Sequence, residues 1–377
     1  MSRRTKSAVL NPIAQRTVDS ETEFAVCRDQ FFSSVVAEAV LPWCFPDLPR
    51  QAIVERACAV KCTEDFQYAF VDPVLKKILN DTSLGLTVSG LDRLPTDRKF
   101  LFISNHRCIV TDATLVSLTM LIGGRGTCKV CLGENLMEKS GVSELLLMVN
   151  GVVIKRTGAR KDVYESAQNV ARYLTQQIEG NRYSIWLSQS PGRTKDGNDH
   201  TDPAIIKMLG LGCGKTSADF EKLHIVPVAV SYEFEPCSME KARETLLRRA
   251  HGHYVKAPGE DLNQIRTSLR TAKGHIHLAF GEELTLVTTP SDDVVQDIVE
   301  KIDRQIWKMY RTWPSNTVAH AALNNQIQEL TSPYAQTFLS MIDKQVRELN
   351  GMGFASEAAR QALLQLYAQP AINAMRT

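Results

Sequence analysis

Residues 100–112 read FLFISNHRCIVTD, and this stretch decides how the rest of the chain is interpreted. Its apolar beginning is typical of a buried strand, and this strand runs directly into Asn105 and His106. Asp112 then opens the segment DATLVSLTML, which has the apolar content of a packed helix. Open α/β sheets bind their ligands at the carboxyl ends of their strands, so we expect a functional site around His106.

Short apolar runs alternate with longer helical patterns after this stretch. The segment 162–179, DVYESAQNVARYLTQQIE, is one of the helical patterns. The strand-like runs are CKVCLG (128–133), GVVIKR (151–156), YSIWLSQ (183–189), HIVPVAVSYE (224–233) and HIHLAF (275–280). This alternation predicts an α/β fold with a mostly parallel sheet flanked by helices.

Helical patterns with few strand signals lie on both sides of this α/β region. Residues 20 to 80 have helical spacing, interrupted by the proline-rich LPWCFPDLP, and the residues from Ser291 onward return to helical spacing. We therefore expect an N-terminal helical region (1–90), an α/β domain (91–290) and a C-terminal helical region (291–377).

The charge balance and the cysteines exclude some classes of protein. Lys and Arg number 44 against 42 for Asp and Glu, a net charge of +2, so we expect no nucleic-acid partner. The nine cysteines are scattered, and their closest pairs lack the nearby partners that a zinc site needs. We expect reduced thiols and no metal.

The sequence contains no clear signal for export or for membrane insertion. The opening segment MSRRTKSAVLNPIAQRT is basic but lacks the apolar core of a secretion signal, so we interpret it as a flexible lead-in. No window reaches the ~18 to 20 uninterrupted apolar residues of a spanning helix. We expect a cytoplasmic protein. If its substrate is a lipid, the protein would either meet the bilayer as a peripheral protein at the inner face of the membrane, through this segment or an amphipathic helix, or take the lipid from a carrier.

His106 and Asp112 are candidates for a general base and its partner. An imidazole with an ordinary pKa of ~6.5 can take a proton from an alcohol, and a carboxylate on its other nitrogen fixes the tautomer. The alternative is that Asp112 only caps the helix that follows and that His106 is a polar loop residue. Capping and orienting are compatible roles for Asp112.

Three further motifs follow in order. The first motif is Asn105, His106 and Asp112, and the second is Gly151 to Arg156 (GVVIKR). The third is Ile185 to Gln189 followed by Pro191, Gly192 and Arg193, and the fourth is Val226 to Val230 (VPVAV). In this order, over about residues 100 to 235, the motifs resemble those of the glycerolipid acyltransferase superfamily, which includes bacterial lysophosphatidate and glycerol-phosphate acyltransferases. Four motifs in order are far more specific than one.

The resemblance implies that the α/β domain moves a fatty acyl group from a thioester donor onto a hydroxyl. It implies His106 as the general base, with no covalent acyl-enzyme, and Asn105 as a substrate-binding residue. It also implies that Arg156 and Arg193 hold the phosphate of the acceptor, which guanidinium groups bind in a bidentate way.

Two more residues are candidates for substrate binding near the third motif. Lys195 could add a point charge for the phosphate, and backbone N–H groups around Gly192 could stabilise the oxyanion of a tetrahedral intermediate. The alternative for the three cationic side chains is that they are solvated surface charges at loop ends.

Two departures from the family pattern affect these expectations. Five residues separate His106 from Asp112, one more than the family usually has, and an extra loop residue can be absorbed before the helix begins. Pro191 stands where the family usually has glutamate, and Thr194 where it usually has arginine. Acceptor recognition is therefore expected to differ from the family norm.

Other chemical patterns are interpreted as structural. The segment 210–217, GLGCGKTS, is one residue short of a phosphate-binding loop, and DPAIIKML before it predicts a helix, so its glycines should end that helix. Cys108 is interpreted as a packing residue.

Two pairs of alternating histidines are also interpreted without a metal. They are His251 with His253, and His275 with His277. Alternate residues of a strand point to the same face, but no further ligand set accompanies either pair.

We expect an O-acyltransferase that acylates glycerol 3-phosphate or a lysophospholipid, with acyl-CoA or acyl carrier protein thioester as co-substrate and without a cofactor. The alternative is a catalytically inactive lipid- or acyl-binding protein of the same fold, which Pro191 and the longer first motif would favour. The intact Asn105, His106, Asp112 and Arg156 favour the enzyme, and an acceptor such as an amino-acid lipid is a third alternative.

Overall fold

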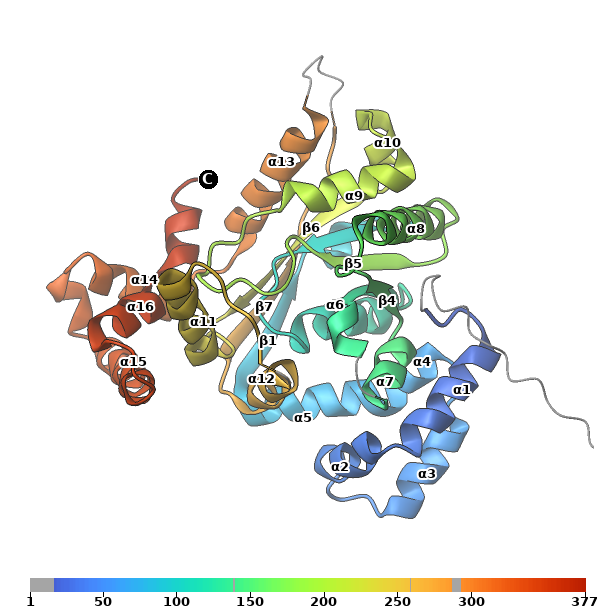
Figure 1. Ribbon diagram of the computed structural model, residues 1–377, viewed down its shortest axis with the longest axis horizontal. Helices are drawn as coiled ribbons and strands as arrows, with labels where there is room; N and C mark the ends of the chain where they lie inside the picture. Colours follow the sequence, from blue (N-terminus) through green and yellow to red (C-terminus); the bar gives the residue numbers. More distant parts are fainter. Residues whose placement is uncertain (1–16, 138–139, 258, 287–292) are drawn as a thin grey trace, which may run out of the picture.

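The computed structural model describes residues 17–137, 140–257, 259–286 and 293–377, and Figure 1 shows its arrangement. A seven-stranded sheet runs through the described residues in the order β1-β7-β6-β2-β5-β3-β4. The strands are β1 Ser83–Ser89, β2 Leu101–Ser104, β3 Cys128–Gly133, β4 Gly151–Ile154, β5 Ser184–Ser188, β6 Ile225–Tyr232 and β7 Gly274–Phe280. Neighbouring strands are parallel except for β6 and β7, which confirms the predicted mostly parallel α/β fold.

Strand β2, which carries the first motif, lies in the interior of the sheet. It is paired with β5 on one side and with β6 on the other, and its last residue, Ser104, aligns with Ser188 and Val228. Because all three strands are parallel, the segments that follow them emerge at the same edge of the sheet. We call this the carboxyl edge.

The period of two along β2 separates two cores. Phe100 and Phe102 belong to one buried cluster, which helix α6 (Thr111–Ile122) covers. Leu101 and Ile103 point to the opposite face and belong to a second cluster. Helices α8 (Arg160–Glu179), α9 (Pro203–Cys213) and α13 (Val294–Met309) pack on that second face. The predicted strand is therefore buried on both faces.

Strand β1 was not anticipated from the sequence. It pairs with β7 at the edge of the sheet, and most of its residues are partly or fully exposed. Its residues, SLGLTVS, are less apolar than those of the interior strands, and Gly85 breaks the pattern at a register shift. This strand lies within residues 1–90, where we expected only helices.

The N-terminal region is helical up to β1. Its helices are α1 (Glu21–Phe32), α2 (Val35–Cys44), α3 (Arg50–Ala59), α4 (Thr63–Phe66), the π-helix η1 (Gln67–Val71) and α5 (Asp72–Thr82). Ser20 and Ser34 cap α1 and α2, because each hydroxyl accepts a hydrogen bond from a first-turn N–H group. Helix α2 runs through Pro42, so the chain breaks later in the proline-rich segment than its composition suggested.

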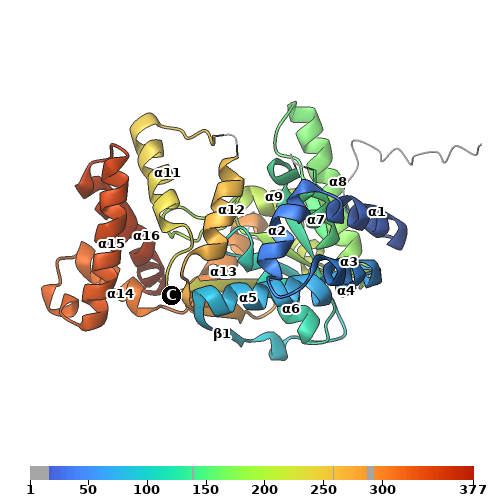
Figure 2. The same cartoon turned by 90° about the horizontal axis from the view of Figure 1, so that it is seen from below.

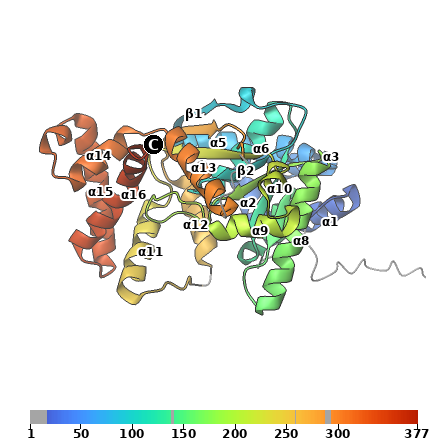
Figure 3. The same ribbon diagram turned by 90° about the horizontal axis from the view of Figure 1, so that it is seen from above.

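The C-terminal region forms its own helical core beside the sheet. It contains α14 (Pro314–Leu323), the 3-10 helix η4 (Ile327–Leu330), α15 (Pro333–Gly351) and α16 (Ser356–Ala374). Helix α11 (Ser238–His251) packs into the same cluster through Ala242 and Leu246. Figures 2 and 3 show α14, α15 and α16 at one end of the molecule, next to α11.

Helices α11 and α12 (Glu260–Arg270) together form an insertion between β6 and β7. The smaller elements are the 3-10 helices η2 (Leu91–Arg93) and η3 (Glu134–Met137), α7 (Val142–Met148) and α10 (Ser217–Glu221). In Figure 2, α11 and α12 rise on the same side of the sheet as the beginning of α8, which follows the end of β4. The insertion therefore borders the carboxyl edge.

The glycine-rich segment 210–217 is not a phosphate-binding loop. Its first residues form the end of α9, as predicted, and Thr216 caps α10. A side chain at Gly212 would lie 2.3 Å from the backbone of Ala171 on α8, so this glycine allows the two helices to approach closely.

Within the described residues, no helix is both long and apolar enough to cross a membrane. The basic segment that we interpreted as a lead-in and as a membrane contact lies almost wholly in residues 1–16, outside the described residues.

Candidate active site

His106 and Asp112 meet at the carboxyl edge of the sheet. His106 follows the end of β2, and Asp112 lies in the first turn of α6. The imidazole Nδ1 lies 2.9 Å from Oδ2 of Asp112, so the extra residue in the first motif is accommodated in the loop. The ring of Trp186 on β5 packs edge-on against the imidazole, with 5.4 Å between the ring centroids.

The Asp112 carboxylate organises the whole loop between β2 and α6. Oδ2 accepts the backbone N–H groups of Arg107 at 2.6 Å and Cys108 at 2.8 Å. Oδ1 accepts the hydroxyl of Tyr232, which stands at the end of β6, at 2.6 Å. Val110 is the N-cap residue of α6, so the hydrogen bonds of Asp112 orient the histidine loop rather than cap the helix.

The electrostatics of the pair favour a neutral imidazole beside an ionised carboxylate. Burial lowers the pKa of His106 below its ordinary value, and the neighbouring Asp112 opposes this shift. Burial acts to raise the pKa of Asp112, but the hydrogen bonds from His106, Tyr232 and the Cys108 N–H outweigh it and hold the pKa below its ordinary value. A side chain that is 14% exposed keeps His106 within reach of a small ligand.

Asn105 is a structural neighbour of the pair. It is fully buried; its Oδ1 accepts the N–H of Val230, and its Nδ2 donates to the carbonyl of Val230 and to Asp199. These bonds join the end of β2 to β6, and they occupy the amide that we predicted to bind substrate. A direct substrate contact by Asn105 stays a prediction.

A buried ionic cluster holds the loop between β2 and α6 in place. Arg107 is fully buried, and its guanidinium donates to Asp199 at 2.6 Å and to Glu235 at 2.9 Å. Lys241 on α11 donates to the carbonyl of Arg107 at 2.7 Å and also bonds Glu235. Buried charges are tolerated only when they are paired in this way. The cluster ties the histidine loop to the loop after β5 and to the insertion.

Sequence reasoning missed Tyr232 and this cluster. One signal was available for Tyr232 and Glu235, because polar residues follow the apolar run of β6 in the segment SYEFE. Nothing in the local sequence indicated that Asp199 would pair with Arg107.

The loop after β5 brings its predicted residues next to His106. The N–H of Thr194 donates to the carbonyl of His106 at 2.9 Å. The positive charge of Arg193 contributes, after burial, to the lowered pKa of His106. Gly192 has a left-handed φ of 80°, and a side chain there would meet no atom within 4 Å, so the turn leaves open space at this point.

Arg193 and Lys195 are held by the insertion. The Arg193 guanidinium is buried, it bonds Gln264 of α12 through one nitrogen, and its Nη1 has no hydrogen-bond partner among the described residues. Lys195 lies 3.5 Å from Glu244 of α11, and burial lowers the pKa of Lys195 to about 8. These are not solvated surface charges, and the unpaired Arg193 nitrogen can bind an anion.

Arg156 lies apart from this group. It follows β4, which is separated from β2 by β5 and β3, so the two strand ends are roughly 14 Å apart at ~4.8 Å per strand. The side chain is exposed, and its backbone N–H and that of Thr157 donate to Glu134. The structure thus brings the loop that carries Gly192, Arg193 and Lys195 into contact with the backbone of His106, and places Arg156 at the far end of the carboxyl edge.

The remaining candidates behave as structural residues. Cys108 is fully buried in the cluster around α6. His275 stacks on Trp313 and bonds Glu233, and no group of metal-ligating side chains occurs in the described residues.

One comparison with known proteins, a family model, covers the region of the four motifs. Residues 85–231 match the family model described as Acyltransferase. The crystal structure of the 1-acyl-sn-glycerophosphate (LPA) acyltransferase PlsC from Thermotoga maritima aligns with 75% of this chain and 90% of its own, at 15% identity and a TM-score of 0.35. No curated protein matches the chain significantly.

Proposed function

We propose that this chain transfers a fatty acyl group from a thioester donor to a hydroxyl of glycerol 3-phosphate or a lysophospholipid. The match of residues 85–231 to the Acyltransferase family model and the four motifs support this proposal. The donor is a thioester of coenzyme A or of acyl carrier protein. The proposed general base is His106, and Asp112 is its orienting partner.

The hydrogen bond between His106 Nδ1 and Asp112 Oδ2 carries this proposal. An ionised carboxylate can only accept, so Nδ1 keeps its proton and Nε2 has a lone pair for the acceptor hydroxyl. In the proposed reaction Nε2 takes the hydroxyl proton while the oxygen attacks the thioester carbonyl. The tetrahedral intermediate collapses, the C–S bond breaks, and the imidazolium returns the proton to the thiolate.

The position of the cations favours a phosphorylated acceptor. Arg193 and Lys195 lie on the loop whose backbone contacts His106, and a buried guanidinium with an unpaired N–H suits a phosphate oxygen. Glycerol 3-phosphate is short, so its phosphate would reach Arg193 more easily than Arg156 while its hydroxyl meets His106. A bulkier lysophospholipid could use both arginines.

A binding protein without activity is the second candidate. Pro191 in the third motif favours it, because the family's usual glutamate is missing there. The intact geometry of His106, Asp112 and Tyr232 favours the enzyme, because none of these hydrogen bonds is needed to bind a lipid.

Acyl transfer by the purified chain tests the proposal. Radiolabelled palmitoyl-CoA and palmitoyl-acyl carrier protein would each be offered with glycerol 3-phosphate, lysophosphatidate and other lysophospholipids. We expect transfer to at least one acceptor, and loss of transfer in His106→Ala.

A second histidine provides a matched control for this variant. His200 forms the same kind of bond to Asp303, also at 2.9 Å, but its side chain is 46% exposed and belongs to no proposed site. His200→Ala should retain activity. No transfer with either donor to any acceptor would favour the binding protein, and equal losses in both variants would contradict the assignment of His106.

A further inference from the structure

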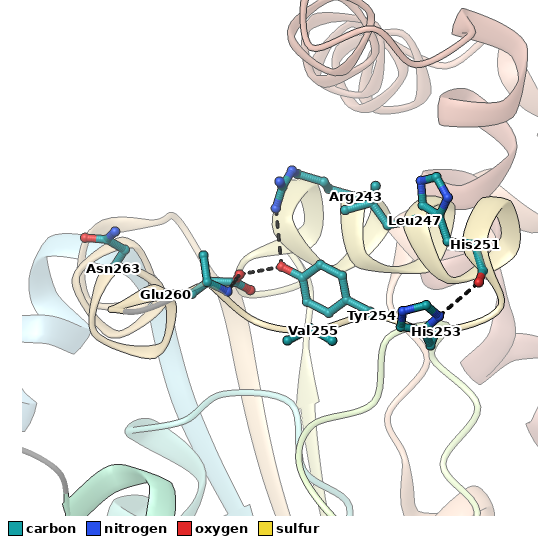
Figure 4. Close-up of a pocket in the computed structure, with 9 residues that line it drawn as sticks. Arg243, Leu247, His251, His253, Tyr254, Val255, Glu260 and Asn263 are labelled. Carbon is teal, nitrogen blue, oxygen red and sulfur yellow. Dashed lines mark hydrogen bonds between the residues drawn. The ribbon is translucent and has the colours of Figure 1, made fainter.

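A cavity of about 670 Å³ lies where α11 leads into α12 (Figure 4). Its walls come from the second half of α11, from residues 253–257 and from the first turn of α12. The lining residues are Arg243, Leu247, His251, His253, Tyr254, Val255, Ala257, Glu260 and Asn263. This volume is within the range of sites that hold a cofactor or a small molecule.

The wall carries several groups that bind phosphate. The Arg243 guanidinium has one hydrogen bond among the described residues, at 3.4 Å to the hydroxyl of Tyr254, so its other N–H groups remain available. His251 and His253 add two imidazoles to the lining, and Nδ1 of His253 bonds the carbonyl of His251 at 3.0 Å (Figure 4). Guanidinium and imidazole groups together are well suited to a phosphate or diphosphate.

The acidic group of the cavity is already engaged. Glu260 accepts the Tyr254 hydroxyl, the N–H of Ala257 at 3.2 Å and the amide of Gln264 at 2.9 Å. The negative charge of the Glu260 carboxylate is therefore stabilised by protein donors, and this reduces the repulsion between Glu260 and an anionic ligand.

The same cavity also presents a flat and apolar surface. In Figure 4 the hydroxyl of Tyr254 points toward Arg243 and Glu260, which it bonds, and the ring extends away from them. Val255 is 77% exposed, and Leu247 completes the apolar part of the lining. An aromatic ring with neighbouring apolar side chains can stack a nucleobase.

A short chain of contacts links the cavity to His106. Glu260 bonds Gln264 one turn later on α12, and Gln264 bonds the guanidinium of Arg193. Thr194, the next residue, donates to the carbonyl of His106. A ligand anchored in the cavity therefore lies on the rim of the proposed active site, within reach of a long flexible arm.

We propose that this cavity binds the phosphorylated nucleoside end of an acyl-CoA donor. Arg243, His251 and His253 contact the phosphates, Tyr254 stacks on the adenine, and the pantetheine arm extends past Arg193 to bring the thioester to His106. The assignment rests on the proposed acyltransferase function and names its donor as coenzyme A rather than acyl carrier protein. The adenine of coenzyme A would stack on Tyr254, whereas the phosphopantetheine arm of acyl carrier protein has no nucleobase that could do so.

Binding of free coenzyme A and of adenosine 3′,5′-bisphosphate to the full chain, measured by isothermal titration calorimetry, tests the site without catalysis. We expect Arg243→Gln and His251→Gln to weaken the binding of both probes about tenfold or more. Arg266→Gln on the exposed side of α12 is the control and should leave binding unchanged. His106→Ala should bind both probes like the wild type, so a failure of catalysis is distinguished from a failure of this site.

Steady-state kinetics gives a second readout. Arg243→Gln should raise KM for palmitoyl-CoA about tenfold, with kcat and the KM of the acceptor little changed. Unchanged binding of both probes in Arg243→Gln and His251→Gln would overturn the proposal. Wild-type protein that ignores coenzyme A but accepts palmitoyl-acyl carrier protein would overturn it as well. Circular dichroism melting curves of each variant show whether it is folded.

Discussion

The hydroxyl of Tyr232 donates a 2.6 Å hydrogen bond to Oδ1 of Asp112, the carboxylate oxygen that His106 does not use. The two residues are 120 positions apart in the sequence, and the pairing of β2 with β6 brings them together. Both oxygens of the carboxylate are thereby fixed, so the imidazole has one orientation. Tyr232 is a positioning residue, because it acts on His106 through Asp112.

Tyr232→Phe removes one donor from a buried carboxylate and tests this role. We expect kcat to fall about tenfold, since a hydrogen bond to a charged group contributes ~1.5 to 3 kcal/mol, while KM for both substrates stays the same. With one donor fewer, the carboxylate of Asp112 should stabilise the protonated imidazole more strongly, so the pKa of His106 and the acid limb of the pH–rate profile should move to higher pH. A lower melting temperature with unchanged kcat and pH profile would mean that Tyr232 is only structural.

The pH dependence of the wild type should show a general base with a lowered pKa. His106 must be neutral to take a proton, and it is neutral above its pKa, which burial places below the ordinary ~6.5. kcat/KM should therefore be level near neutral pH and fall only below pH ~6.5. An acid limb centred clearly above this value would contradict the assignment.

Asp112→Asn should reduce kcat by about 10³-fold or more. The backbone N–H groups of Arg107 and Cys108 hold the amide oxygen toward Nδ1, so the tautomer is kept, but the negative charge that stabilises the imidazolium is lost. A single-turnover assay with the thioester donor measures the loss. A decrease of less than tenfold would show that the charge of the carboxylate does not support the proton transfer.

Arg193 and Arg156 should differ in their effect on a short acceptor. Arg193→Gln should raise KM for glycerol 3-phosphate by about 10- to 100-fold, the equivalent of one charge-assisted hydrogen bond, whereas Arg156→Gln should change it less. Arg193 precedes Thr194, whose N–H donates to the carbonyl of His106, whereas Arg156 follows a strand whose end is roughly 14 Å from that of β2. An equal or reversed order of the two effects would place the phosphate nearer β4. A glycerol acceptor without phosphate is the control and should be insensitive to both changes.

Arg107→Met should destabilise the fold by about 3 to 5 kcal/mol, because it leaves the buried Asp199 and Glu235 without their cation. Lys161→Met is the matched control. Lys161 is 84% exposed and lies 3.8 Å from Glu165, so its loss should cost no more than about 0.5 kcal/mol. Urea denaturation of the two variants measures both values. Similar small losses would mean that the buried cluster contributes little to stability.

Much of the fold could be predicted because the interior strands are short, apolar and well separated. CKVCLG forms β3 with the predicted bounds, and the predicted helix at 162–179 forms α8 with two additional residues at its beginning. Strand β1 could not be recognised, because an edge strand needs no continuous apolar run. The sequence also did not show that the segment between β6 and β7 forms two helices that border the carboxyl edge.

The candidate site was predictable in part for a similar reason. His106 follows an apolar run, and strand ends are readable from sequence, so its place at the sheet edge followed directly. The contacts of Arg193 with Gln264 and of Lys195 with Glu244 were not predictable, because both partners belong to the insertion.

By itself, the sequence determined which residues form the strands of the interior and that Asn105, His106 and Asp112 stand between a strand and a helix. These features are local, since hydrophobic periodicity and strand length depend on neighbouring residues. Only the tertiary structure decided that Tyr232 holds Asp112, that Asp199 and Glu235 neutralise Arg107, and that the insertion encloses Arg193 and Lys195. These contacts depend on the order in which the strands pair, and that order brings residues about 50 to 130 positions apart to one edge of the sheet.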